Sequence, residues 1–174
     1  PVVCPSGSCT LHLKEHLKGN ENAVQYLKQH IFELTEFITD TIGFDFSNAY
    51  FPHKVGFHNS CHGQRGLHLS SMSELVLPAF SKPIQLLSKI KGIEILHPKR
   101  VDECCGFGGT FCVTEEALSV KMGNDRLLEH LENGVEIITA NDMSCLMHLE
   151  GIIKRNNYPI QIMHIAEILN NSLQ

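Results

Sequence analysis

The sequence lacks the features that would attach a protein directly to a membrane or to nucleic acid. No apolar stretch approaches the roughly 18 residues of a membrane-spanning helix, and no signal peptide is visible. No basic run accompanies the net charge of -5, so a nucleic-acid surface is not expected. Hydrophobic residues make up 43% of the 174-residue chain, which suits an ordinary core in one sizeable domain or two small ones.

The chain also lacks an initial methionine. It begins with the apolar run Pro1-Val2-Val3-Cys4, which looks like the end of a strand. We therefore interpret the sequence as a piece of a longer protein, whose upstream part is missing together with any signal or anchor that it carried.

Seven cysteines are present, but the two Cys-x-x-Cys pairs of a compact zinc module are absent. Seven is an odd number, so the cysteines cannot all pair within the chain, and adjacent Cys104 and Cys105 rarely bridge because that ring is strained. Clustered cysteines without an export signal are typical of metal binding or redox chemistry in a reducing compartment. We therefore expect a cytoplasmic metalloprotein. The alternative is that the thiols are only small apolar side chains of the core.

Strand patterns and helix patterns alternate along most of the chain. Strand-like runs lie at residues 2–4, 55–57, 93–96, 135–139 and 159–163. Helical patterns lie at residues 11–17, 24–38, 72–91, 114–132, 144–155 and 165–169. This alternation predicts an α/β fold with a doubly wound, Rossmann-like parallel sheet that helices cover on both faces. A polar and aromatic connector at residues 45–53 marks a boundary between residues 1–50 and residues 51–174.

The longest periodic segment lies near the start of the chain. Its apolar residues recur at three- and four-residue steps from Val24 to Ile38, which indicates one helix with a buried face. Gly43 lies just past this segment, where a helix stop is expected.

Four cysteines follow successive strands of the alternating region. Cys61 comes after the strand at 55–57, Cys104 and Cys105 come after the next strand, and Cys145 comes after the third. The carboxyl ends of parallel strands share one edge, where open α/β sheets bind ligands. The 42 residues between Cys61 and Cys104, and the 39 between Cys105 and Cys145, each suit one helix-plus-strand unit. These thiols are therefore expected to meet and to bind one metal centre.

The donor type limits the metal. Thiolates favour zinc, copper(I) and iron–sulfur centres over magnesium or calcium, and four of them can hold a structural zinc ion or a [4Fe–4S] cluster. Gly106, Gly108 and Gly109 would let the backbone approach a bulky centre, and their N–H groups would bond to cluster sulfides. The alternative for this loop is a structural glycine turn.

Two segments carry a resemblance to a known family: Asn59-Ser60-Cys61-His62-Gly63-Gln64-Arg65 and Glu103-Cys104-Cys105-Gly106-Phe107-Gly108-Gly109-Thr110-Phe111. They are similar to the motifs of the cysteine-rich CCG-domain proteins, which include iron–sulfur subunits of lactate utilization, glycolate oxidation and heterodisulfide reduction. Residues 144–148 match that family's closing cysteine motif, and residues 5–9 match the closing motif of a preceding, duplicated half. The likeness covers nearly the whole chain, and the double-cysteine loop is its most specific part.

The resemblance implies an iron–sulfur electron-transfer subunit of an oxidoreductase complex that oxidises a 2-hydroxy acid, with L-lactate to pyruvate as the expected reaction. Its expected partners are other iron–sulfur and accessory subunits of a lactate or glycolate oxidation complex. It also implies a complete second CCG domain at residues 51–174 and a remnant of the first at residues 1–50, where Cys9 belongs to a partial second site. Relatives often close with Cys-x-x-Cys, whereas this chain has only Cys145, which leaves the nuclearity of the cluster open.

Several polar residues near Cys61 are candidates for a supporting role. Among His58, His62 and His68, His62 is preferred as a partner of the thiolates because it adjoins Cys61. Arg65 would offset the charge of a thiolate cluster or hold a carboxylate. Local polar roles are the alternative for each of these side chains, and no catalytic residue is assigned.

The remaining candidates favour simpler roles. Cys4 and Cys112 are expected to be core thiols, and Asp142 either turns toward the site or caps the following helix. Two rival functions stay open: a zinc-stabilised scaffold without redox turnover, and a thiol–disulfide enzyme in which Cys104 or Cys105 attacks a disulfide.

Overall fold

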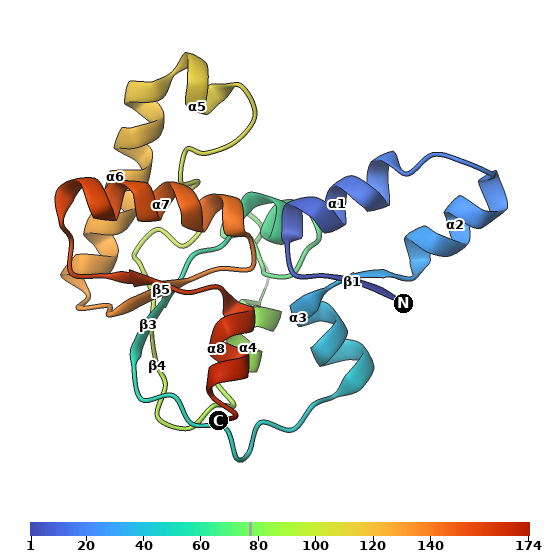
Figure 1. Cartoon of the computed structure of the whole chain (residues 1–174), viewed down its shortest axis with the longest axis horizontal. Coiled ribbons are helices and arrows are strands. Elements are labelled where there is room, and N and C mark those ends of the chain that lie inside the picture. The colour runs from blue at the N-terminus through green and yellow to red at the C-terminus, as the bar shows by residue number, and fades with distance from the viewer. Residues whose placement is uncertain (77) are drawn as a thin grey trace.

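Figure 1 shows the computed structural model of the protein, in which residues 1–76 and 78–174 are described. The main sheet has four parallel strands in the order β4-β3-β5-β6. These strands are β3 (Lys54–Phe57), β4 (Glu94–Leu96), β5 (Ile137–Thr139) and β6 (Gln161–Ile162). The predicted parallel sheet is confirmed, and all its strands lie at runs that the sequence marks as strands.

Helices cover both faces of this sheet. They are α4 (Lys82–Leu87), α6 (Glu116–Glu132), α7 (Met143–Asn156) and α8 (Ile165–Asn171). One buried cluster joins Val55, Phe57 and Ile137 to α4 and α8, and a second joins Ile138 to α6 and α7. Successive residues of a strand point to opposite faces, so the two clusters lie on opposite sides of the sheet. Figure 1 shows the corresponding helices on the two sides. The doubly wound, Rossmann-like fold is therefore confirmed.

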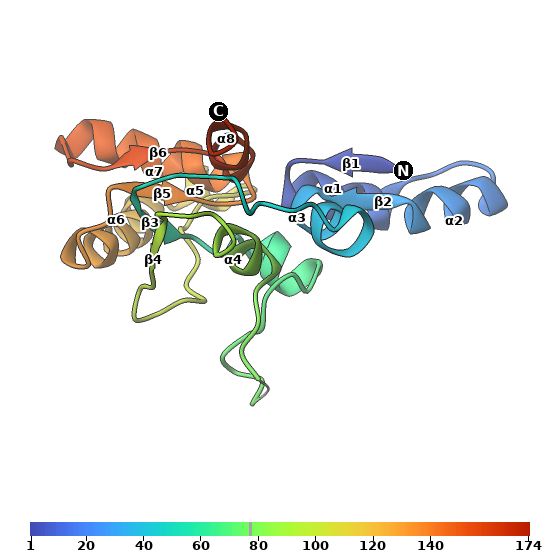
Figure 2. The same ribbon diagram turned by 90° about the horizontal axis from the view of Figure 1, so that it is seen from below.

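A second, two-stranded parallel sheet lies beside the main one (Figure 2). The N-terminal elements are β1 (Val2–Cys4), α1 (Gly7–His16), α2 (Glu21–Gln29), β2 (Ile31–Glu33), α3 (Leu34–Glu36) and the π-helix η1 (Phe37–Ile42). The start of α1 joins this region to the main sheet. Gly7 N donates to the carbonyl oxygen of Asn141 at 3.0 Å, and Ser8 N donates to Oδ2 of Asp142 at 2.8 Å.

The helix predicted from Val24 to Ile38 is wrong. α2 ends at Gln29, and Ile31 begins β2, which pairs in parallel with β1. The apolar steps fit a helix, but hydrogen bonds to a distant strand override that local pattern. Helical structure resumes at Leu34, directly after Glu33, whose side chain caps α3. Gly43, with φ of +62°, does end η1, as its position past the periodic segment predicts.

The helix predicted over residues 72–91 is also largely wrong, because α4 is the only helix among the described residues of that range. Before α4 the chain runs through a turn in which Ser71 N donates to the carbonyl oxygen of Phe80 at 2.9 Å. These cross-turn hydrogen bonds use backbone groups that a helix would need. Pro83 lies in the first turn of α4, where a missing N–H costs little. Leu77 lies outside the described residues.

The later helices agree with the sequence pattern. α6, α7 and α8 are confirmed, and a short α5 (Phe111–Thr114) precedes α6. Among residues 1–76 and 78–174, no helix combines the length and apolar character that crossing a bilayer requires.

His130 on α6 gives the stability of the fold a pH dependence. It is fully buried against Gly56 of β3, and neither ring nitrogen has a hydrogen-bond partner among the described residues. Burial lowers the pKa of His130 to about 3. In the unfolded chain a histidine has a pKa of about 6.5, so as the pH falls the unfolded state binds the proton first.

We therefore expect this contribution to be fully present above pH ~6.5 and to be lost as the pH falls toward ~3, at about 1.4 kcal/mol per pH unit. Urea unfolding of the wild type and of His130→Leu at several pH values measures it. The free energy of unfolding should depend less steeply on pH in the variant. An identical dependence in both proteins would contradict the assignment.

Candidate metal centre

Four cysteines lie at the carboxyl edge of the main sheet. Cys61 follows β3 and precedes the π-helix η2 (His62–Gly66), Cys104 and Cys105 lie in the loop after β4, and Cys145 lies in the first turn of α7, after β5. The chain leaves β3 toward α4 on one face and leaves the neighbouring β5 toward α7 on the other. The edge between β3 and β5 is therefore the topological switch point, where sheets of this kind open a crevice for ligands.

The structure brings the four thiols into one continuous chain of contacts. Hydrogen-bond contacts link Cys61 with Cys104, Cys104 with Cys105, and Cys105 with Cys145. Cys105 is only 1% exposed and Cys145 only 8%, while Cys61 and Cys104 are half-buried. One side of the group thus faces the protein interior and the other lies nearer the surface.

The contacts divide the thiols into donors and acceptors of protons. Hydrogen bonds from Cys105 and then Cys61 hold the pKa of the Cys104 thiol far below its usual range. A hydrogen bond from Cys105 lowers the pKa of Cys145 to about 5, although burial opposes this. The pKa values of Cys61 and Cys105 are raised, first by their hydrogen bonds to Cys104. Neighbouring thiols thus favour the thiolate forms of Cys104 and Cys145, and a bound cation would displace the protons that remain on the group.

The donor set fits an iron–sulfur cluster or zinc. The four clustered donors are all sulfur. Two of them, Cys105 and Cys145, form a tight group with His58, and among the described residues no carboxylate belongs to that group. Sulfur donors of this kind select zinc, copper(I) or iron–sulfur centres, and four thiolates complete the ligand set of a cubane cluster.

The glycine loop approaches the thiols closely. Gly106, Gly108 and Gly109 have φ values of +84°, +134° and +55°, in the left-handed region that side chains disfavour. Gly106 N donates to the sulfur of Cys104 at 3.3 Å. The carbonyl oxygen of Gly106 accepts from Ser119 Oγ at 2.8 Å, which ties the loop to α6.

A polar network supports the segment that carries Cys61. Ser60 Oγ donates to Oδ1 of Asn141 at 3.0 Å and accepts from Gly63 N at 3.2 Å. Asp142 caps α7 and also accepts from Ser8 N. Of the two roles considered for Asp142, capping is the one found. This network connects the loops after β3 and β5 to the start of α1.

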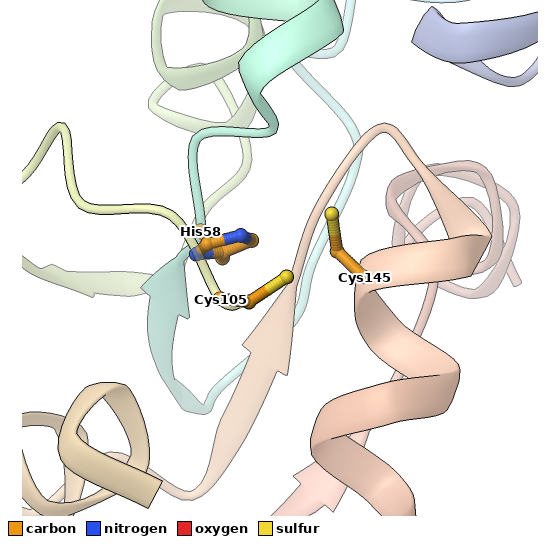
Figure 3. A group of neighbouring side chains, drawn as sticks. All are labelled: His58, Cys105 and Cys145. Carbon is orange, nitrogen blue, oxygen red and sulfur yellow. The ribbon is translucent and has the colours of Figure 1, made fainter. Parts of the chain in front are cut away.

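The histidine that the structure brings to the thiols is His58. A ring nitrogen of His58 and the sulfurs of Cys105 and Cys145 lie within 4.8 Å of one another (Figure 3). His62, which the sequence favours, is exposed on η2. Arg65 is also exposed there and forms an ion pair with Glu74. The strand-end rule that selects the cysteines would also have selected His58, because it is the first residue after β3.

The other three cysteines lie outside this chain of thiols. Cys9 is exposed in the first turn of α1, Cys4 is half-buried in β1, and Cys112 is half-buried on α5 with its sulfur 3.7 Å from the carbonyl oxygen of Gly109. Cys9 follows a strand end, as Cys61 and Cys145 do. Cys4 and Cys112 are thus less buried than core thiols are expected to be.

Comparison with known proteins gives this geometry a family context. The family model described as a cysteine-rich domain (CCG) matches residues 55–150, which include all four clustered cysteines. The chain is 36% identical to lactate utilization protein A of Bacillus licheniformis over 176 residues, which is 98% of this chain and 70% of that protein. It is 35% identical to the protein of that name from a Geobacillus species over 177 residues, again 98% and 70% of the two chains.

A third relative, lactate utilization protein A of an Exiguobacterium species, is 34% identical over 179 residues, which is 99% of this chain and 69% of that protein. The similarity therefore extends through the N-terminal elements as well as the main sheet. The chain belongs to the cysteine-rich CCG-domain family.

Proposed function

We propose that this chain is an iron–sulfur electron-transfer subunit of an oxidoreductase complex that oxidises a 2-hydroxy acid, namely L-lactate to pyruvate. The observation that carries the proposal is the chain of contacts through Cys61, Cys104, Cys105 and Cys145 at the switch point. The relatives that match nearly the whole chain are named for lactate utilization, which supports the choice of substrate.

The same four cysteines would hold the cluster as thiolates, and a bound [4Fe–4S] cluster would supply a one-electron carrier. The surrounding residues would adjust the reduction potential of the cluster. Gly106 N donates to the Cys104 sulfur, and such hydrogen bonds favour the more negatively charged, reduced state. The half-buried positions of Cys61 and Cys104 leave one side near the surface, where electrons could pass to another protein.

The proposal extends to the organisation of the longer protein. Residues 51–174 would be a complete CCG domain, and residues 1–50 would be the end of a first domain, to which Cys9 belongs as part of a second site. The separate sheet of β1 and β2 supports this division. Other iron–sulfur and accessory subunits of a lactate or glycolate oxidation complex would be its partners, in the reducing cytoplasm that seven free thiols suit.

Anaerobic reconstitution tests the nature of the centre. The chain is incubated with iron and sulfide under argon, or with zinc in a parallel sample, then desalted and analysed for both metals and acid-labile sulfide. We expect a brown protein with about four irons and four sulfides per chain. A matched sample of Cys112→Ser should give the same content, because Cys112 lies outside the chain of thiols.

The outcomes separate the three functions. Stoichiometric zinc that iron and sulfide cannot replace would support the zinc-stabilised scaffold. A protein that takes up neither metal but exchanges thiols rapidly would support the thiol–disulfide enzyme, for which the half-buried Cys104 with its lowered pKa is the candidate nucleophile. Either result would overturn the iron–sulfur proposal.

A further inference from the structure

His58 lies where the main sheet meets the thiols. It is the first residue after β3, and its backbone N–H donates to the carbonyl oxygen of Thr139 at 2.8 Å, which continues the hydrogen bonding between β3 and β5. The residue is 3% exposed. Its backbone is therefore held by the sheet, and its ring lies inside the carboxyl edge rather than on the surface.

The imidazole of His58 carries one buried polar atom that lacks a hydrogen-bond partner among the described residues. That atom is Nε2. Leaving such a group unpaired costs about 1–3 kcal/mol, so most buried polar atoms have a partner. The sulfurs of Cys105 and Cys145 lie within 4.8 Å of a ring nitrogen (Figure 3).

Of the nearby thiols, Cys145 is the one that pairs with the His58 ring. The side chains of His58 and Cys145 are in contact, and a ring nitrogen lies within 4.8 Å of the sulfur. The ring follows β3 directly and the sulfur lies in the first turn of α7, after the neighbouring β5, so the fold brings them together. Both side chains point into the same space at the edge of β3 and β5 (Figure 3).

We propose that His58 donates an N–H···S hydrogen bond to the Cys145 thiolate of the assembled centre and thereby raises its reduction potential. The inference rests on the proposed iron–sulfur function and adds a positioning residue to it. A hydrogen bond to a ligand sulfur withdraws electron density, which stabilises the reduced centre more than the oxidised one because the reduced centre is more negative.

Donation is favoured over coordination because the four thiolates already complete the ligand set of a cubane cluster. Histidine coordinates iron in clusters where it replaces cysteine. Here His58 would be a fifth donor, close to a sulfur that is itself a ligand. The remaining role for its buried N–H group is to bond to that sulfur.

The test is a redox titration of the reconstituted full chain, monitored through the visible or electron paramagnetic resonance signal of the centre. His58→Leu removes the donor, His58→Gln keeps an N–H donor, and His62→Leu removes an exposed imidazole of the same segment as a matched control. We expect equal iron and sulfide in all four proteins. His58→Leu should shift the midpoint potential down by about 59 mV, a tenfold change in the ratio of reduced to oxidised centre for one electron.

The glutamine variant should recover part of that shift, and His62→Leu should show none. Pulsed electron paramagnetic resonance of the wild type with ¹⁵N-histidine should detect a weak nitrogen coupling through the hydrogen bond. That measurement decides the matter if His58→Leu fails to assemble a centre. A strong coupling typical of a directly bound nitrogen, or none at all, would overturn the inference, as would an unchanged potential in His58→Leu.

Failure of the iron–sulfur proposal would give a different experimental result from failure of the inference about His58. If the wild type itself takes up no iron and sulfide, the iron–sulfur function is wrong and this inference falls with it. If the wild type carries a cluster but His58 has no influence on its potential or its nitrogen coupling, only this inference is wrong.

Discussion

Replacing Cys105 with serine is expected to reduce the iron content of the reconstituted protein by at least roughly tenfold, since even outer-shell partners of metal ligands commonly contribute 10–100-fold to affinity. Cys105 contacts both Cys104 and Cys145, so its loss interrupts the chain of thiols in the middle. It is also the most buried of the four. A serine hydroxyl is a poor ligand for iron and cannot bridge the same distance between the two neighbouring sulfurs.

Loss of the metal centre in Cys105→Ser has to be distinguished from unfolding of the variant. Placing a hydroxyl in this core costs about 1–3 kcal/mol if it is unsatisfied. Circular dichroism and urea unfolding of the metal-free proteins give that loss, and iron and sulfide analysis after reconstitution gives the loss of the centre. Cys112→Ser is the matched control, because its sulfur only approaches the carbonyl oxygen of Gly109. Normal iron content in a folded Cys105→Ser protein would remove Cys105 from the ligand set.

Gly106→Ala is expected to be the most destabilising substitution in the glycine loop, by about 2–6 kcal/mol, the sum of backbone strain and overpacking. The residue has φ of +84°, and an added Cβ would lie 2.7 Å from the carbonyl oxygen of Ser119 and 2.9 Å from Cβ of Met122. Neither atom is the free end of a flexible side chain. The loop would have to move away from α6, and the Cys104 and Cys105 sulfurs would move with it.

Gly108→Ala is the matched control for Gly106→Ala. Gly108 also has a positive φ, of +134°, but a Cβ there would meet nothing within 4 Å. Its substitution should cost only the backbone strain, about 1–3 kcal/mol. Urea unfolding of the metal-free proteins compares the two, and reconstitution shows whether the loop still presents its thiols. Equal losses of stability in both variants would mean that the contact with α6 does not matter.

The strands and the grouping of the cysteines were accessible from the sequence. Short apolar runs that alternate with helical patterns mark β3 to β6, because each pattern reflects a local backbone period and local burial. Given parallel strands, the rule that their carboxyl ends share an edge brings Cys61, Cys104–Cys105 and Cys145 together. No packing detail is needed for that inference, only the order of strands and thiols along the chain.

Tertiary contacts, rather than the local sequence, determine the backbone at Ile31 and which histidine lies beside the thiols. Ile31 has helical spacing with its neighbours, yet it pairs with Val2, a residue far away in the sequence. His62 adjoins Cys61 in sequence, yet it is exposed, whereas His58 is buried beside Cys105 and Cys145. In both cases the result depends on hydrogen bonds between strands that the local pattern does not contain.

The sequence by itself determined that this chain could assemble several thiols at one edge of a parallel sheet. The type of each donor and its position after a strand both follow from short stretches of sequence. Only the tertiary structure decided which strands are neighbours and which side chains are buried between them. The pairing of β3 with β5 puts the ring of His58 beside Cys145, and the packing of Gly106 against α6 sets the position of the double-cysteine loop. Such contacts join residues that are distant along the chain, so their energies depend on the whole fold rather than on any one segment.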